Sequence, residues 1–292
     1  MKDTNIYEIV IKASETGSFS KAAEVLNYTQ SGISQAIKEV EKELGIQLFV
    51  RARQGVILTE NGKKVLPYMQ EMLNQKEKML QASYEINNKV AGKLRIGSFS
   101  SVTAMWMSDI IHWFKENYPE VKIEILDGNY DQILDWLIHG QIDCGFLSSI
   151  CVEDFKFYDL YKDPLYAVVP KNHPLTSKQK VTVKDVCQYP FIAEAPGCDN
   201  DIQKLLQREK ASPNIQYSFL DDFLIMSFVR NNIGVTISQS LVLEATPYPG
   251  VVPIKLSPNY ERTIGLCFAH ESMSLLEKIF LQHMQEYCKS KN

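Results

Sequence analysis

A short polar stretch between residues 30 and 38 carries the side chains best suited to bind another molecule. On one side of a predicted helix, near its N-terminal end, lie Gln30, Ser31, Ser34, Gln35 and Lys38. Gln can pair with the N6/N7 edge of adenine, and Ser can hydrogen-bond to a base or a phosphate. This face suits insertion into the major groove of DNA. A solvated face of a three-helix bundle would show the same composition.

Three predicted helices hold this polar face in place. The first has apolar residues at helical spacing from Ile6 to Ala13 and stops near Gly17. Ser20 is the expected N-cap of the second helix, residues 21–26, and Thr29 is the expected N-cap of the third. The buried positions expected in the third helix are Ile33, Ala36, Ile37, Val40 and Leu44.

A predicted β-hairpin, residues 48–58, follows the third helix, which ends at Gly45. The corner is Gln54-Gly55, and Arg51 and Arg53 fall near the tip. Arginines there suit contacts with phosphates or with a narrow minor groove. The candidate DNA-binding residues are Ser20, Lys21, Thr29, Gln30, Ser31, Ser34, Gln35, Lys38, Arg51 and Arg53.

Four segments of this region carry a family pattern. They are GSFSKAAE at 17–24, TQSGIS at 29–34, the Glu-rich stretch through Leu44-Gly45 and Leu48-Phe49 to Arg51, and Leu58-Thr59 followed by Gly62. Together they resemble the winged helix-turn-helix of LysR-type transcriptional regulators. The resemblance implies that residues 1–58 form a DNA-binding domain. Three departures concern base preference: the family often has Pro-Ala at Ser31-Gly32, Arg at Gln35 and an acidic residue at Val50.

Residues 59–91 form a predicted helical connector. Apolar residues recur at alternating steps of four and three from Val65 through Met72 to Val90, with interruptions at Lys76 and Ser83. This is the pattern of a two-stranded helical pair, although one long helix packed on its own domain would look similar. Pro67 either kinks the helix or marks its true start, because proline has no backbone N–H to donate.

The resemblance implies that residues 59–91 are a dimerising linker and that the chain assembles further into a tetramer. Two recognition helices would then meet half-sites about one helical turn apart. The expected partner is therefore double-stranded DNA with a pseudo-palindromic operator. The resemblance also allows RNA polymerase as a partner. The choice between dimer and tetramer stays open.

Residues 92–292 alternate predicted strands and helices. Strands at 94–97, 121–126 and 142–147, with helices between them, form a βαβαβ unit with a parallel sheet. A second α/β unit has strands near 165–169, 191–193, 215–219 and 235–237, and helices near 199–210 and 223–231. A strand at 263–268 and a helix at 272–289 close the chain.

The resemblance extends to this region. It implies an effector-binding regulatory domain, residues 92–292, with two α/β subdomains hinged as in periplasmic binding proteins. Subdomain one is then 92–162 with 268–292, and subdomain two is 163–267. The chain would cross near Asp163-Pro164 and return near 263–268.

Ligands of open parallel sheets lie beyond the carboxyl ends of the strands. There the resemblance places a small-molecule effector on Ser98, Phe99, Ser100, Ser101, Gly128, Ser148 and Ala195. Hydroxyls and free N–H groups at a helix start favour an anionic or carboxylate ligand. Glu194 would instead favour a cationic group if it points inward, so the charge of the ligand stays open. The serines are equally suited to ordinary caps and turns.

Composition agrees with a two-part globular protein. The 292 residues have a net charge of −4, which argues against non-specific coating of nucleic acid. No apolar run is long enough to span a membrane, and MKDTNIYEIV does not have the layout of a signal peptide. The six cysteines show no CxxC and no metal-type spacing. We therefore expect reduced thiols and a cytoplasmic protein.

Catalytic signatures are absent from the sequence: there is no GxSxG, Walker loop, GxGxxG or HExxH. We expect no enzymatic activity, no catalytic residues, no metal and no cofactor. The acidic pair Asp221-Asp222 is expected to stabilise a helix start. Two alternatives remain: an α/β binding protein or enzyme with an appended helical module, and a regulator switched by oxidation of Cys187 and Cys198.

Overall fold

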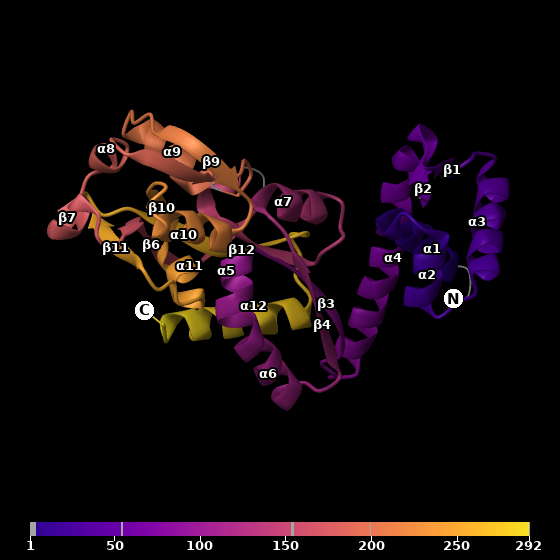
Figure 1. Cartoon of the computed structure of the whole chain (residues 1–292). Helices are drawn as coiled ribbons and strands as arrows, with labels where there is room; N and C mark the ends of the chain where they lie inside the picture. The colour runs from indigo at the N-terminus through magenta and orange to yellow at the C-terminus, as the bar shows by residue number, and fades with distance from the viewer. Residues whose placement is uncertain (1–3, 54, 153–154, 199, 292) are drawn as a thin grey trace. The chain divides into compact units, whose positions relative to one another are not determined.

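The computed structural model describes residues 4–53, 55–152, 155–198 and 200–291 (Figure 1). The chain divides into two compact units. The first is Met1–Lys89 with His139–Gln141, and the second is Val90–Ile138 with Ile142–Asn292. Among the described residues, no helix is both long and apolar enough to cross a membrane.

Three helices build the start of the first unit: α1 (Thr4–Thr16), α2 (Phe19–Leu26) and α3 (Gln30–Leu44). The expected N-cap Thr29 is confirmed, since its Oγ1 accepts a hydrogen bond from Gly32 N at 3.1 Å. The expected N-cap Ser20 is wrong. Ser18 is extended and accepts from Lys21 N, so α2 begins earlier and Ser20 lies inside its first turn.

The inner faces of these helices meet in one core. Val10 and Ala13 of α1 and Ile33, Ile37 and Val40 of α3 are buried there. Leu44, also expected in the core, is 41% exposed because it is the last residue of α3.

The expected hairpin is β1 (Phe49–Ala52) paired with β2 (Gly55–Leu58), with Ala52 opposite Gly55. Gln54, half of the expected corner, lies outside the described residues. Gly55 is not a corner residue but begins β2, with φ +131. The hairpin is fastened to the end of α1, because Val56 N donates to Gly17 O at 2.8 Å.

Gly55→Ala is expected to destabilise the first unit. A Cβ at Gly55 would lie 2.1 Å from Gly17 O, and its φ lies in the region that favours glycine. We expect the free energy of unfolding to fall by about 1–2 kcal/mol because of the backbone conformation. Breaking the hydrogen bond from Val56 N to Gly17 O adds to this loss. Urea unfolding of the full chain followed by circular dichroism measures it. The control is Gly45→Ala, where φ is also positive but nothing lies within 4 Å; equal losses would contradict the role of the close approach.

The connector is a single helix, α4 (Glu60–Ile86), capped by Thr59. It runs through Pro67, so the suggestion that Pro67 marks its start is wrong. Two residues of the expected pairing seam, Val65 and Met69, pack instead in the core of the first unit. Val90 lies beyond the helix end and packs in the second unit.

What remains on the surface of α4 is an apolar stripe. Met72 is 47% exposed, Met79 56% and Ile86 81%. These residues are seven apart, so they fall on nearly the same side of a helix.

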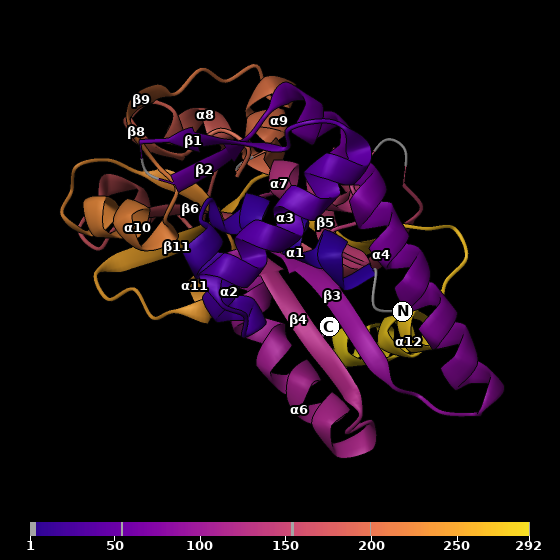
Figure 2. The ribbon, with the colours of Figure 1, turned by 90° about the vertical axis from the view of Figure 1, so that its right-hand side faces the viewer.

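The second unit begins with the expected parallel βαβαβ arrangement. Strand β3 (Gly92–Ser98) pairs in parallel with β4 (Val121–Asp127) and with β5 (Cys144–Ser148). Figure 2 shows β3 and β4 side by side. The first connection is a helical segment: α5 (Ser100–Val102), a π-helical turn Thr103–Met107, and α6 (Ser108–Asn117). The second is α7 (Tyr130–Ile138).

Two antiparallel strands lie in the middle of the eight-stranded sheet of this unit and join its two halves. They are β6 (Phe157–Pro170) and β12 (Glu261–Phe268), paired with Asp163 opposite Arg262. The early part of β6 pairs with β12, and its later part pairs with β10 (Thr236–Gln239) and β11 (Val251–Leu256). The chain thus crosses from one half of the sheet to the other near Asp163, as expected. We expected residues 263–267 in subdomain two, but Ile264–Phe268 pairs with β5 and belongs to the half of the sheet that contains β3, β4 and β5.

The remaining elements complete the two subdomains. Three of the expected elements are β8 (Pro190–Glu194), β9 (Asn214–Phe219) and α10 (Asp222–Arg230). The expected helix 199–210 is shorter, α9 (Asn200–Arg208), and Asp199 lies outside the described residues. The sequence predicted neither β7 (Lys180–Val181) nor α11 (Ser240–Ala245), and it did not predict the strand β11. The short helix α8 (Val183–Val186) ends directly before Cys187. The last helix, α12 (Leu275–Lys289), begins with a capping box of Ser274 and Glu277.

Candidate functional sites

The polar face of α3 is available to a partner. Gln30, Ser31, Gln35 and Lys38 are exposed, and Ser34 is half-buried. In Figure 1, α3 lies at the edge of its unit, with α1, α2 and α4 on its inner side. Gln35 Nε2 donates to Glu39 Oε1 at 3.3 Å, while Ser31 Oγ lies 3.2 Å from Thr29 Oγ1. The capping contacts therefore engage Thr29 and Ser31 but leave Gln30 and Lys38 free of side-chain hydrogen bonds within the described part of the chain.

The remaining DNA-binding candidates also lie on the surface. Ser20 and Lys21 are exposed in the first turn of α2. Arg51 is exposed on β1, opposite Val56, and Arg53 is exposed in the connection between β1 and β2. Cationic side chains are thus presented at the tip of the hairpin.

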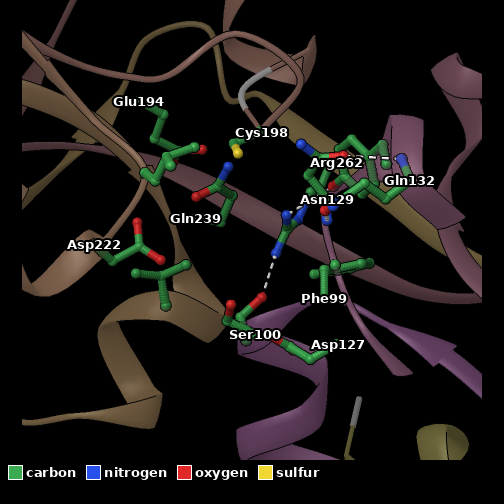
Figure 3. A pocket seen from close by; sticks show the side chains of 15 residues that line it. Phe99, Ser100, Asp127, Asn129, Gln132, Glu194, Cys198, Asp222, Gln239 and Arg262 are labelled. Atoms are coloured by element: carbon green, nitrogen blue, oxygen red, sulfur yellow. Dashed lines mark hydrogen bonds between the residues drawn. The ribbon is translucent and has the colours of Figure 1, made fainter. Parts of the chain in front are cut away.

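A cleft of about 280 Å³ opens in the second unit and contains four of the seven predicted effector residues. Phe99, Ser100, Ser101 and Gly128 line it, as Figure 3 shows for the first two. From Ser100 to Asn117 the chain is continuously helical. The opposite side of the cleft is lined by residues of subdomain two, among them Glu194, Asp222 and Gln239.

Three predicted effector residues do not line this cleft. Ser98 is the last residue of β3 and is buried, with a hydroxyl that has no hydrogen-bond partner among the described residues. Ser148 is also buried in its sheet and donates to Asp201 Oδ1 at 2.6 Å. Ala195 comes after β8 and is not among the lining residues. These three residues do not line the cleft because successive side chains at a strand end point to opposite faces of the sheet. Their contact with an effector stays a prediction.

The strongest interaction at the cleft was missed from the sequence. Arg262 Nε donates to Asp163 Oδ2 at 2.9 Å, Nη1 donates to Tyr130 Oη at 2.9 Å, and Nη2 donates to Ser101 Oγ at 3.1 Å. Its guanidinium carbon lies 5.0 Å from the ring centroid of Phe99. Burial alone would lower the pKa of Arg262, but Tyr130, Asp163 and Asp201 outweigh burial and raise it. Arg262 therefore stays charged and joins both crossing strands to the helical wall of the cleft.

Asp221 and Asp222 have different roles. Asp221 caps α10, accepting a hydrogen bond from Phe223 N at 2.8 Å, as expected for an acid at a helix start. Asp222, the next residue, lines the cleft instead. Burial raises the pKa of Asp222 to about 6, against the attraction of Arg262. No local pattern in the sequence distinguishes these two neighbours.

Cys187 and Cys198, the two cysteines of the oxidation alternative, lie in different surroundings. No disulfide joins the described cysteines. Burial raises the pKa of Cys187, and it raises that of Cys151 to about 11, which makes both thiols weaker nucleophiles. Cys198 lines the cleft and Cys187 packs beside the core of subdomain two. Among the described residues there is also no cluster of side chains suited to a metal ion.

Comparison with known families agrees with both units. Residues 5–63 match the family model described as "Bacterial regulatory helix-turn-helix protein, lysR family", and residues 87–289 match "LysR substrate binding domain". The uncharacterized HTH-type transcriptional regulator YvbU of Bacillus subtilis (strain 168) is 30% identical over 282 residues, covering 96% of each chain. AlsR of the same organism is 29% identical over 236 residues, covering 77% of this chain and 76% of AlsR.

Solved structures share the fold of the whole chain. Full-length OxyR C199D from Pseudomonas aeruginosa is similar with a TM-score of 0.73 and 21% identity, covering 99% of this chain and 95% of that one. Full-length CbnR in complex with its target DNA is similar with a TM-score of 0.68 and 16% identity, covering 97% and 99%.

Proposed function

This chain belongs to the LysR family of DNA-binding transcriptional regulators, and from that premise we propose that the exposed face of α3 reads the bases of its operator. The proposal is carried by the division of α3 into two faces. Ile33, Ile37 and Val40 fix the helix in its core, and Gln30, Gln35 and Lys38 face outward. The solved complex of CbnR with its target DNA supports the same use of the fold here.

Gln30→Ala is expected to relax base preference. Loss of a paired hydrogen bond to adenine should reduce discrimination between the operator and a base-substituted operator by about 1–3 kcal/mol. Competition binding measured by fluorescence anisotropy tests it. The control is Gln207→Ala in α9, because Gln207 is an exposed glutamine that belongs neither to the polar face of α3 nor to the apolar stripe of α4. Unchanged discrimination in Gln30→Ala would remove the base-reading role.

We assign the two hairpin arginines to the DNA backbone or to a narrow minor groove. Arg51→Ala is expected to weaken binding to all sequences alike. If one phosphate contact is lost, the slope of log K against log salt becomes shallower by about 0.9. A salt series with operator and scrambled DNA measures this, and an unaltered slope would place Arg51 away from the DNA.

Dimerisation is assigned to the stripe of Met72, Met79 and Ile86 on α4. The area is apolar, exposed and repeats every seven residues, as a helical pair requires. A two-fold dimer presents two copies of α3, so the operator is expected to be a pseudo-palindrome. Assembly into a tetramer and contact with RNA polymerase remain predictions. Because the chromosome is the target, we place the protein in the bacterial cytoplasm.

The cleft is proposed to bind a small-molecule effector between the subdomains. Ser100 and Ser101 offer hydroxyls at the start of a helical segment, and Phe99 and Gly128 line the same side. An effector that fits one arrangement of the subdomains better than another shifts the population of DNA-binding states. We propose that this happens without catalysis, metal or cofactor. Turnover of a candidate metabolite by the purified full chain would contradict the sensor and favour an enzyme.

A further inference from the structure

The side chains of the effector cleft carry more negative than positive charge. Its lining includes three carboxylates, Asp127, Glu194 and Asp222, and one guanidinium, that of Arg262. Arg262 is already paired with Asp163, its Nη2 lying 2.8 Å from Asp163 Oδ2. Counted over the lining side chains alone, carboxylates therefore outnumber cations three to one.

Behind Arg262 lies a further carboxylate. Asp201 accepts hydrogen bonds from Tyr130 Oη at 3.1 Å and from Ser148 Oγ at 2.6 Å. Tyr130 in turn accepts from Arg262, so Asp163 and Asp201 both act on the same guanidinium. The positive charge of Arg262 is thus engaged by the protein itself.

A buried hydrogen-bond acceptor lines the same cleft as Glu194 and Asp222. Gln239, the last residue of β10, is 1% exposed and lines the cleft, and its Oε1 has no hydrogen-bond partner among the described residues. Figure 3 shows its amide directed into the space bordered by Glu194, Cys198 and Asp222. A buried acceptor without a donor is costly, so this position calls for a donor from a ligand.

Asp222 is equally unsatisfied. Within the described part of the chain, no hydrogen bond or ion pair reaches its carboxylate, although it is partly buried at the start of α10. The charged and titratable groups that interact with it electrostatically are Arg262, Asp221 and Tyr248. Only Arg262 among these is cationic, and it is committed to Asp163.

We propose that the effector presents a protonated amine or an amidinium to the wall formed by Glu194, Asp222 and Gln239. A cationic nitrogen carries several donors, and three acceptors from three different elements surround this part of the cleft. The hydroxyls of Ser100 and Ser101 then take the polar group at the other end of the ligand. The inference rests on the proposed function of the cleft and specifies the chemical class of its ligand.

The raised pKa of Asp222 supports this assignment. At neutral pH the carboxylate of Asp222 is ionised although its burial makes ionisation unfavourable. A bound cation would stabilise the ionised carboxylate and offset this free-energy cost. The affinity for an amine should therefore fall as pH decreases from about 7 to 5, because Asp222 takes up a proton while the amine stays charged.

The test uses the full chain and four probes of equal carbon number in isothermal titration calorimetry. They are 1,4-diaminobutane, 4-aminobutanoate, butane-1,4-diol and succinate. We expect the two amines to bind at millimolar concentration or below, and the diol to bind at least about tenfold more weakly. Asp222→Asn and Gln239→Met should each weaken the amines by about tenfold or more. The matched control, Asp221→Asn, removes the neighbouring carboxylate, keeps a good N-cap residue and should change affinity by less than about twofold.

Three results would overturn the amine assignment: no binding of either amine, equal binding of the diol, or amine binding that Asp222→Asn leaves unchanged. DNA binding of each variant is measured in parallel. This measurement distinguishes failure of the amine assignment from failure of the proposed regulatory role of the cleft. If succinate alone binds and alters DNA affinity, the cleft is still the effector site and only the amine assignment fails. If the amines bind with the expected pattern but DNA affinity never changes, the amine assignment holds and the regulatory role of the cleft fails.

Discussion

Arg262→Met is expected to lower the free energy of unfolding by about 3–5 kcal/mol, because it leaves a buried carboxylate without its counter-ion. Asp163 is 0% exposed and receives hydrogen bonds only from Arg262 and from Leu241 N within the described residues. The same substitution frees Tyr130 Oη and Ser101 Oγ from their donor. Urea unfolding monitored by circular dichroism measures the loss.

The loss should depend on pH in a defined direction. Burial raises the pKa of Asp163 above its usual value even with Arg262 present, and without Arg262 the pKa must rise further. A carboxyl whose pKa is higher in the folded than in the unfolded protein stabilises the fold at low pH, where it is protonated in both states. This contribution to the free energy of unfolding is lost as pH rises through the folded pKa. The variant should therefore be less impaired at pH 5 than at pH 8.

A double variant supplies the control. Arg262→Met with Asp163→Leu removes both charges and should recover part of the stability lost in the single variant, because no unpaired charge remains. If the double variant is as unstable as the sum of the two single ones, the two residues do not act as a pair.

The second large effect concerns assembly. Met72→Lys combined with Met79→Lys places two charges in the middle of the proposed helical pair on each chain. Burying an unpaired charge costs more free energy than burying an unpaired neutral polar group, which costs about 1–3 kcal/mol. The dissociation constant of the dimer should therefore rise by more than about a hundredfold. Sedimentation velocity over a concentration series measures the dissociation constant.

Gln81→Lys is the matched control for this experiment. Gln81 is a half-buried residue of the same helix, and it follows Met79 by two positions. Two positions turn an α-helix by about 200°, so Gln81 lies on the side away from the stripe of Met72, Met79 and Ile86. The substitution adds a lysine whose long stem can carry its charge to solvent, and it should leave the dimer intact. An intact dimer in the double-lysine variant would contradict the stripe as the interface.

Local patterns account for the parts that the sequence predicted well. The first three helices and the hairpin follow from apolar spacing, from Thr29 as a cap and from Gly45 as a stop, and each of these signals lies within or next to the element that it defines. Ser20 was misjudged because Ser18 and Ser20 are both good caps, and only the extended backbone at Ser18 decides between them. Val65 and Met69 were misjudged because they pack inside their own unit, and apolar spacing alone does not separate them from the exposed Met72 and Met79 of the same helix.

The cleft was harder to predict because its parts are distant in the chain. Arg262 meets Asp163 only through the pairing of β12 with β6, which joins residues far apart in sequence. Nothing near Arg262 in the sequence marks it as a buried residue. Gln239 is equally ordinary in sequence. Only the fold buries its acceptor in the cleft that Asp222 also lines, with no hydrogen-bond donor from the part of the chain that the structure describes.

The central claim is that this chain recognises a two-fold DNA sequence through α3. Selection of binding sites from random double-stranded DNA by the purified full chain, at about 0.15 M salt, tests that claim most directly. We predict enrichment of a pseudo-palindrome with half-sites about one helical turn apart, and its loss when Gln30 and Gln35 are both replaced by Ala. Selection of no common sequence, or of the same sequence by the double variant, would contradict recognition by α3.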